Sequence, residues 1–127
     1  MKLLICGSRD WSPTIDEIDR ELRLGFPSDV IFTEVVSGKA NGADRAGEDW
    51  AQSRGISIKP FPADWKRYNR AAGAIRNAAM ADYTDVALAF LKNRSRGTSD
   101  MIAKLGARQK YTWVVEWGAV SRQLSLL

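Results

Sequence analysis

The sequence predicts a single α/β domain built on a mostly parallel sheet of about five strands, with helices on both faces. The length of 127 residues fits one domain, so residues 1–127 are expected to fold together. Short apolar runs alternate along the chain with segments whose apolar residues recur at helical spacing, the pattern of βαβ units. The first apolar run is unbroken, which is typical of a strand buried on both faces of a parallel sheet.

The first strand is expected at residues 2–6 (KLLIC), where that unbroken apolar run lies. A helix is expected to follow, with Ser12 as its N-cap and Pro13 in its first turn. Gly25 is expected to end this helix, because glycine readily adopts the left-handed conformation that closes many helices.

The remaining elements continue the alternation. Strands are expected within residues 30–36 and at 56–61, 84–90 and 111–117, and helices at 42–54, 71–81 and 98–109. Thr98 is interpreted as the N-cap of the last helix, and residues 62–70 as a polar loop with aromatics. In the tail, Val120, Leu124 and Leu127 are spaced for a short amphipathic helix that would pack on the sheet or on a second subunit.

The composition excludes several kinds of catalytic site. The chain has no histidine and one cysteine, so zinc would find almost no ligands, and Ser-His-Asp and Cys-His chemistry are excluded. Any general acid or base must therefore be a carboxylate, a tyrosine or a lysine. No cofactor and no metal site are predicted; carboxylate-bound Mg²⁺ stays open, although no spacing of acidic residues indicates it.

Cysteine content, hydropathy and charge bear on location and partners. Cys6 is the single cysteine, which excludes an internal disulfide and suits a reducing, cytoplasmic location. No apolar run approaches the roughly 20 residues of a membrane span, so no membrane partner is predicted. The net charge of +4 favours anionic partners, and residues 65–81 and 86–99 contain basic residues but no acid.

Four loops are expected to share the edge of the sheet where the strands end. They read CGSRDW, SGKANGAD, FPADWKRYNR and KNRSRGTSD. In open α/β sheets, ligands bind outside the carboxyl ends of the strands, at the point where the strand order reverses. Gly38 and Gly42 would let the backbone of the second loop approach a ligand, although a tight turn alone would also use them. This loop matches neither the P-loop nor the GxGxxG fingerprint.

The fourth loop contains the ingredients of a phosphate site. Arg94 and Arg96 supply charge, Gly97 supplies backbone access, and Thr98 supplies a hydroxyl at the start of a helix. A solvated basic loop is the alternative interpretation. The motif AGAIRNAAM, in the helix expected after the third loop, adds Arg76 and Asn77. The third loop itself adds Trp65 and Tyr68, which either stack on a base or cover an edge of the core.

Together, GSRDW, VVSGKANGADRAGEDWA, FPADW, AAGAIRNAAM and AFLKNRSRGTSDM resemble the YspA-like branch of the SLOG superfamily, over residues 3 to about 115. That superfamily also contains the Lonely Guy (LOG) nucleotide phosphoribohydrolases and the Rossmann part of the DNA-processing protein DprA. The resemblance implies a Rossmann-like sheet and a site for a nucleotide or nucleotide-derived ligand. LOG enzymes cleave the N-glycosidic bond of nucleoside 5′-monophosphates.

The resemblance also implies roles for particular positions. The LOG phosphate loop corresponds to residues 94–98, its first Gly-rich loop to residues 37–44, and its Arg-Lys motif to Arg76 and Asn77. The departures concern catalysis. Asn77 replaces the LOG lysine, and Met101 stands where LOG enzymes have the catalytic glutamate. The nearest acid, Asp100, is one position early, about 100° round the helix.

We therefore expect a protein that binds a phosphorylated nucleotide-type ligand, with a nucleotide N-glycosidase and a DprA-like single-stranded nucleic-acid binder as alternatives. The residues expected to bind phosphate are Arg96, Gly97 and Thr98. The facing wall of the site is expected to consist of Gly7, Ser8, Arg9, Ser37, Gly38 and Gly42, and the ribose or a second phosphate is expected to contact Arg76 and Asn77. The residues able to act as acid, base or hydroxyl acceptor are Asp10, Asp44 and Asp100. Binding to single-stranded nucleic acid is expected to be weak. A homodimer is compatible with the pairing of LOG relatives.

Overall fold

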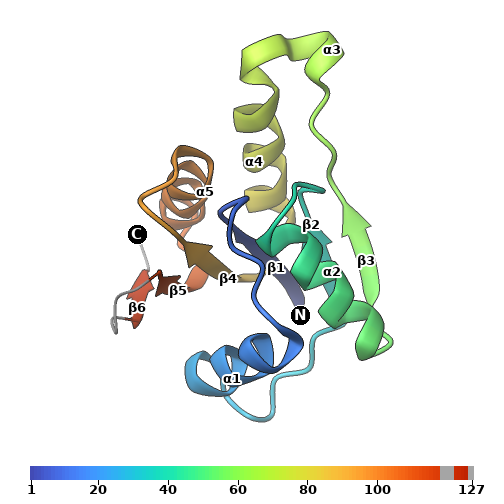
Figure 1. The fold of residues 1–127 in the computed structure, drawn as a ribbon, viewed down its shortest axis with the longest axis vertical. Coiled ribbons are helices and arrows are strands. Elements are labelled where there is room, and N and C mark those ends of the chain that lie inside the picture. The colour runs from blue at the N-terminus through green and yellow to red at the C-terminus, as the bar shows by residue number, and fades with distance from the viewer. Residues whose placement is uncertain (118–121, 126–127) are drawn as a thin grey trace.

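The computed structural model describes residues 1–117 and 122–125 and contains a six-stranded sheet in the order β3-β2-β1-β4-β5-β6 (Figure 1). The strands are β1 (Lys2–Gly7), β2 (Glu34–Ser37), β3 (Ser57–Pro60), β4 (Val86–Leu91), β5 (Tyr111–Glu116) and β6 (Arg122–Ser125). The first five strands pair in parallel, and β6 pairs antiparallel with β5. The expected fold class, a Rossmann-like domain with about five mostly parallel strands, is confirmed.

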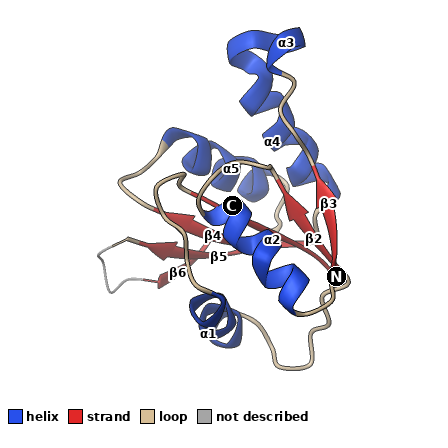
Figure 2. Cartoon of the chain, turned by 45° about the vertical axis from the view of Figure 1, so that its right-hand side comes forward, coloured by secondary structure: helices blue, strands red, loops and turns tan. Residues whose placement is uncertain are grey.

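Helices cover both faces of this sheet. They are α1 (Ile15–Gly25), α2 (Ala43–Ser53), α3 (Trp65–Tyr68), α4 (Ala72–Tyr83) and α5 (Arg96–Ala107), with a short 3₁₀ helix, η1 (Asn69–Ala71), between α3 and α4. Helices α1 and α2 pack on one face, and α4 and α5 on the other (Figure 2). The short helix α3 and the first turn of α4 stand away from the sheet (Figure 1).

The central strand β1 divides the core in two because side chains alternate across a strand. Leu3 and Ile5 are fully buried in the cluster under α1 and α2. Leu4 and Cys6 belong to the opposite cluster, under α4 and α5. An unbroken apolar strand is therefore required at this position, since both of its faces are covered.

Three local expectations are corrected by the structure. Helix α1 is capped by Thr14 rather than Ser12, because Thr14 and Glu17 form a reciprocal capping box. The N-cap position of α5 is Ser95 rather than Thr98, since the chain turns early through the positive φ angles of Asn93 (52°) and Arg94 (50°). The expected loop at residues 62–70 contains α3 and the start of η1.

The tail also differs from the expected helix. Leu124 lies in strand β6, which hydrogen-bonds along β5, so the segment Arg122–Ser125 is extended. Val120 and Leu127, the other two positions of the expected apolar stripe, lie outside the described residues.

The strand order positions the functional site. Strand β1 lies between β2 and β4, and the chain leaves β1 toward α1 on one face and leaves β4 toward α5 on the other. The loops after these two neighbouring strands therefore diverge. Divergence of this kind opens a crevice at the carboxyl edge of the sheet.

Candidate functional site

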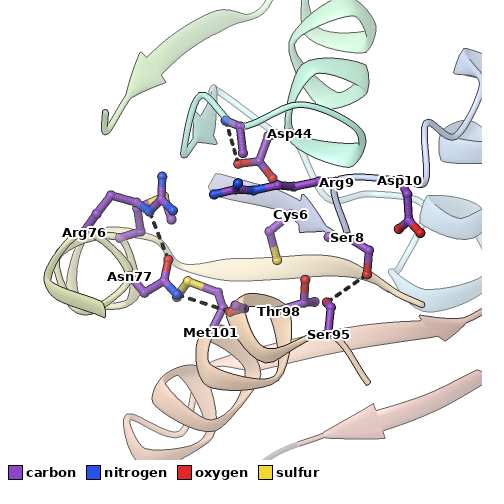
Figure 3. Close-up of a pocket in the computed structure, with 14 residues that line it drawn as sticks. Cys6, Ser8, Arg9, Asp10, Asp44, Arg76, Asn77, Ser95, Thr98 and Met101 are labelled. Atoms are coloured by element: carbon purple, nitrogen blue, oxygen red, sulfur yellow. Dashed lines mark hydrogen bonds between the residues drawn. The ribbon is translucent and has the colours of Figure 1, made fainter. Parts of the chain in front are cut away.

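A cavity of about 350 Å³ lies at the carboxyl ends of β1 and β4, at the point where the strand order reverses. Its lining comes from the end of β1 and the following loop (Cys6, Gly7, Ser8, Arg9 and Asp10), the loop before α2 and the first turn of α2 (Ala40 and Asp44), α4 (Arg76, Asn77 and Met80) and the start of α5 (Ser95, Gly97, Thr98 and Met101). Figure 3 draws these lining residues as sticks and labels ten of them. We call this the switch-point cavity.

The N-terminus of α5 opens into the switch-point cavity without a side-chain cap. The N-cap residue Ser95 instead places its hydroxyl 2.9 Å from the hydroxyl of Ser8 on the β1 side (Figure 3). The first turn is open at Gly97, where even a Cβ would meet nothing within 4 Å. The first-turn N–H groups of a helix carry a partial positive charge and need acceptors, so this end of α5 can bind an anion.

Asn77 joins α4 to the start of α5. Its amide nitrogen donates to the carbonyl of Gly97 at 3.2 Å and to Oδ2 of Asp100 at 3.0 Å. Its amide oxygen accepts from Nε of Arg76 at 3.0 Å. Through these hydrogen bonds, the buried Asn77 fixes the position of the Arg76 guanidinium relative to the N-terminus of α5.

Arg76 is placed across the cavity by this network. Its Nη1 donates to the carbonyl of Gly38 at 2.5 Å, beyond the end of β2. Burial lowers the pKa of Arg76, the Asp44 carboxylate acts to raise it, and the positive charge of Arg9 lowers it further. The two guanidinium groups are therefore close enough to repel each other (Figure 3).

Arg9 is the least constrained cation of the site. It is exposed, and among the residues that the structure describes it takes part in no ion pair. Its side chain reaches over the cavity toward Arg76 (Figure 3). An anion between the two guanidinium groups would relieve their repulsion and gain charge-assisted hydrogen bonds.

Asp44 contributes a buried carboxyl group to the same cavity. Only 5% of the residue is exposed, and Oδ2 accepts from the backbone N–H of Ala40 at 3.3 Å. Burial raises the pKa of Asp44 to about 6, although hydrogen bonds from the backbone of Ala40 and Gly7 and the charge of Arg76 act to lower it. This carboxyl can accept a hydrogen bond from a ligand hydroxyl or exchange a proton near neutral pH.

The other two candidate acids are held by lysines. Asp10 lines the cavity, with its carboxylate 3.3 Å from Nζ of Lys92. Asp100 is not among the lining residues; it pairs with Lys104 at 2.5 Å. Burial acts to raise the pKa of Asp100, but the bonds from Lys104 and Asn77 bring it below its ordinary value. The cavity wall next to Asp100 is formed by Met101, which is 1% exposed.

Cys6 lies in the cavity floor as a thiol. Burial and the neighbouring Asp44 carboxylate raise the pKa of Cys6 far above its ordinary value, which outweighs the effect of Arg76. A protonated, buried thiol is a poor nucleophile and contributes apolar surface.

The glycine-rich loop after β2 splits into residues with different surroundings. Ser37 is fully buried and donates to Oε2 of Glu48 at 2.6 Å. Gly38 sits between two site residues, since a Cβ there would lie 2.8 Å from Oδ2 of Asp44 and 2.9 Å from Nη1 of Arg76. Gly42, with φ 76°, packs against the backbone of Ser8 and Arg9 and lines neither this cavity nor the one beside it.

A second cavity of about 300 Å³ adjoins the first on the side of β2 and α3. It is lined by Arg9, Gly38, Lys39, Ala40, Asn41, Pro62, Ala63, Trp65 and Arg76, and we call it the tryptophan cavity. Of the two stacking candidates, Trp65 lines this cavity and is 51% exposed. Tyr68 lines neither cavity, and the guanidinium of Arg67 lies 5.1 Å from the centre of its ring.

Only some residues of the expected phosphate loop line a cavity. Gly97 and Thr98 line the switch-point cavity, whereas Arg94 and Arg96 are exposed and line neither cavity. The residue missed in this loop is Ser95, which occupies the N-cap position of α5 but directs its hydroxyl to Ser8 and not to the helix backbone. Its signal was present, because serine is a preferred N-cap and stands three residues before Thr98. Lys39 and Asn41, which line the tryptophan cavity, had no comparable signal.

The described part of the chain contains neither a metal-binding cluster nor a membrane-spanning helix. Among residues 1–117 and 122–125, no group of three or more His, Cys, Asp or Glu side chains is arranged to hold a metal ion. Within the same part of the chain, no helix has both the length and the apolar character that crossing a bilayer requires.

The parallel sheet and the crevice at its point of strand reversal define a Rossmann-like α/β protein with a ligand-type cavity at the carboxyl edge. The model of the YspA, cpYpsA-related SLOG family matches residues 1–68, just over half of the chain, and the protein belongs to this family. Searches of curated proteins and of solved structures found no match. Family membership suggests a nucleotide-related ligand. The matched segment runs from β1 through α3, so it includes Arg9, Asp44 and Trp65.

Proposed function

We propose that the switch-point cavity binds a phosphorylated nucleotide-type ligand, with its phosphate at the N-terminus of α5. The observation that carries the proposal is that an uncapped helix N-terminus and two arginine side chains meet in one cavity. Helix N–H groups and guanidinium groups are the protein groups best suited to bind phosphate.

The charges of the cavity favour one orientation of the ligand. A phosphate near Asp44 would meet a carboxyl group that ionises around neutral pH, and like charges repel. A ribose hydroxyl in the same place would instead donate a hydrogen bond to that carboxyl. The phosphate therefore lies toward Gly97 and Thr98, and the sugar toward Asp44.

Arg9→Ala tests this proposal without disturbing the fold, since Arg9 is exposed and makes no ion pair among the described residues. Calorimetric titrations with nucleoside mono- and diphosphates should give an affinity about tenfold lower or more, because a hydrogen bond to a charged group contributes about 1.5–3 kcal/mol. Arg23→Ala, at an exposed position in the last turn of α1, removes the same charge as a control and should bind like the wild type. Equal affinity of Arg9→Ala and Arg23→Ala would place the phosphate elsewhere.

A second candidate function, cleavage of the N-glycosidic bond, is favoured by Asp44. Glycoside cleavage requires a carboxylate beside the anomeric carbon, and Asp44 is a cavity carboxyl with a pKa near neutrality. Release of free base from nucleoside 5′-monophosphates is the assay. We expect slow or absent turnover with binding retained, because Met101 occupies the position that the resemblance assigns to the catalytic glutamate. Robust turnover lost in Asp44→Asn but kept in Asp100→Asn would make this the leading function.

A further inference from the structure

The tryptophan cavity is not used by the proposed function, and its position makes it an extension of the switch-point cavity. Arg9, Ala40 and Arg76 line both cavities, so the two share a common wall. Their volumes, about 350 and about 300 Å³, each lie near the lower end of the range for small-molecule sites, roughly 300–1,000 Å³. Taken together they suit a ligand longer than either cavity alone would hold.

We infer that the ligand is a phosphate-bridged compound with a ring-bearing group at each end, of the class of nucleoside diphosphate sugars or dinucleotides, and that one ring occupies the tryptophan cavity. This inference rests on the proposed function. It adds the class of ligand and a second subsite.

Trp65 supplies the surface on which a ring would stack. It begins the short helix α3, which has no buried residue, and half of its side chain is exposed. One edge of the indole is supported by the start of α4, since a Cβ at Gly73 would lie 3.6 Å from Cη2 of Trp65. Exposed, supported aromatic rings are the surfaces on which bases and other flat rings stack.

The charges of the tryptophan cavity match a phosphate-bearing ligand. Its lining contains Arg9, Arg76 and Lys39 and no acidic residue, whereas Asp44 and Asp10 line only the switch-point cavity. Both arginines stand at the junction. A ligand of this class carries two linked phosphates. One can lie at the N-terminus of α5, as in the proposed function, and the other at the junction, bound by the two guanidinium groups that otherwise repel each other.

The test compares short and extended probes of the same base by calorimetry. The pairs are adenosine monophosphate with NAD⁺, which adds a flat nicotinamide ring, guanosine monophosphate with GDP-mannose, and uridine monophosphate with UDP-glucose. For at least one pair, the extended probe should bind the wild type about tenfold more tightly than the monophosphate, the size expected of one stacked ring. Trp65→Ala should remove most of that gain and change the affinity for the monophosphate less than about twofold.

Ile75→Ala is the matched control. Ile75 is an apolar side chain on the neighbouring helix α4 with a similar exposure, 43% against 51% for Trp65, and it lines neither cavity. It should leave the affinity for both probes unchanged.

The possible failures separate the two proposals. Binding of monophosphates with no gain for any extended probe overturns the inference and leaves the proposed function intact. Equal weakening of both probes by Trp65→Ala also overturns it, because a single nucleotide would then span both cavities. If no probe of any pair binds, the proposed function and the inference both fail.

Discussion

At the scale of single residues, Asp44 couples the site to the stability of the fold. Burial raises the pKa of this carboxyl from 3.8 to about 6, so between these values the folded state binds more protons than the unfolded state. Stability contributed by the protonated form is therefore lost as the pH rises through this window. A carboxyl group in a cavity whose pKa is raised by burial is typical of a functional position.

Asp44→Asn should remove this loss. The amide cannot ionise, and its oxygen can still accept from the backbone N–H of Ala40. In urea unfolding measured from pH 4 to pH 7.5, the variant should gain stability relative to the wild type as the pH rises. Asp49→Asn, at an exposed position on the same helix, should follow the wild-type profile. Parallel profiles for the wild type and Asp44→Asn would show that the carboxyl titrates normally.

Gly42 illustrates a second residue-scale requirement, the close packing of two loops. Gly42→Ala should destabilise the fold strongly, because its φ is 76° and the new Cβ would lie 2.5 Å from the carbonyl oxygens of Ser8 and Arg9. Gly55 provides the comparison: its φ is 67°, but a Cβ there meets nothing within 4 Å. Gly55→Ala should cost only the backbone strain, about 1–3 kcal/mol, and Gly42→Ala clearly more by urea unfolding. Equal costs would mean that the contact with the Ser8–Arg9 backbone is loose.

At the scale of elements, the joint between α4 and α5 depends on the donors of one amide. Asn77→Asp should weaken it, because a carboxylate would then face the carbonyl of Gly97 and the carboxylate of Asp100. The expected loss of stability is about 1–3 kcal/mol. Adding Asp100→Asn should restore part of it, since a donor and an acceptor face each other again. Thermal unfolding of the two single variants and the double variant measures this coupling. If the effects of Asn77→Asp and Asp100→Asn on stability are additive, the two side chains do not interact and the proposed joint between α4 and α5 is contradicted.

The elements show which features a sequence can predict. The unbroken apolar run of β1 and the helical stripes specify the parallel sheet, because burial on particular faces requires those patterns. The N-cap of α5 lies three residues before the one that the sequence predicts, since the chain turns through positive φ angles at Asn93 and Arg94, and the residue type of Arg94 does not indicate such an angle. Local pattern alone does not determine such turns.

The candidate site, too, has features that the sequence predicts and features that it does not. The loops that meet at the sheet edge could be predicted, because the carboxyl ends of parallel strands share one edge. Which side chains face the cavity could not, because that depends on tertiary contacts. Arg9 and Arg96 look alike in sequence, yet one reaches over the cavity and the other is exposed outside it. Likewise, Trp65 lines the tryptophan cavity, whereas Tyr68 lines neither cavity.

At the scale of the whole molecule, some basic residues line the cavities and others lie on an exposed arm. Lys66, Arg67 and Arg70 lie on α3 and η1, which stand away from the sheet (Figure 1). Cations on so short an arm can contact few phosphates of a strand. We therefore retain weak single-stranded nucleic-acid binding as a prediction, and likewise the homodimer, which sedimentation of the purified chain tests.

Single-stranded DNA should bind weakly and with a steep dependence on salt, with a log–log slope near −0.7 for each phosphate neutralised. Fluorescence anisotropy of a labelled oligonucleotide at several salt concentrations measures both quantities. Submicromolar affinity at physiological salt, competed poorly by mononucleotides, would favour the DprA-like alternative.

The central claim is that phosphate binds at the N-terminus of α5, and the most direct measurement is an NMR titration of backbone amides with nucleoside mono- and diphosphates. Hydrogen bonding to phosphate shifts the signals of the donating N–H groups. The account predicts the largest shifts at Gly97 and Thr98, with smaller ones at the end of β1, and their loss in Arg9→Ala. Shifts that concentrate on α3 and η1, or anywhere away from the switch-point cavity, would contradict it.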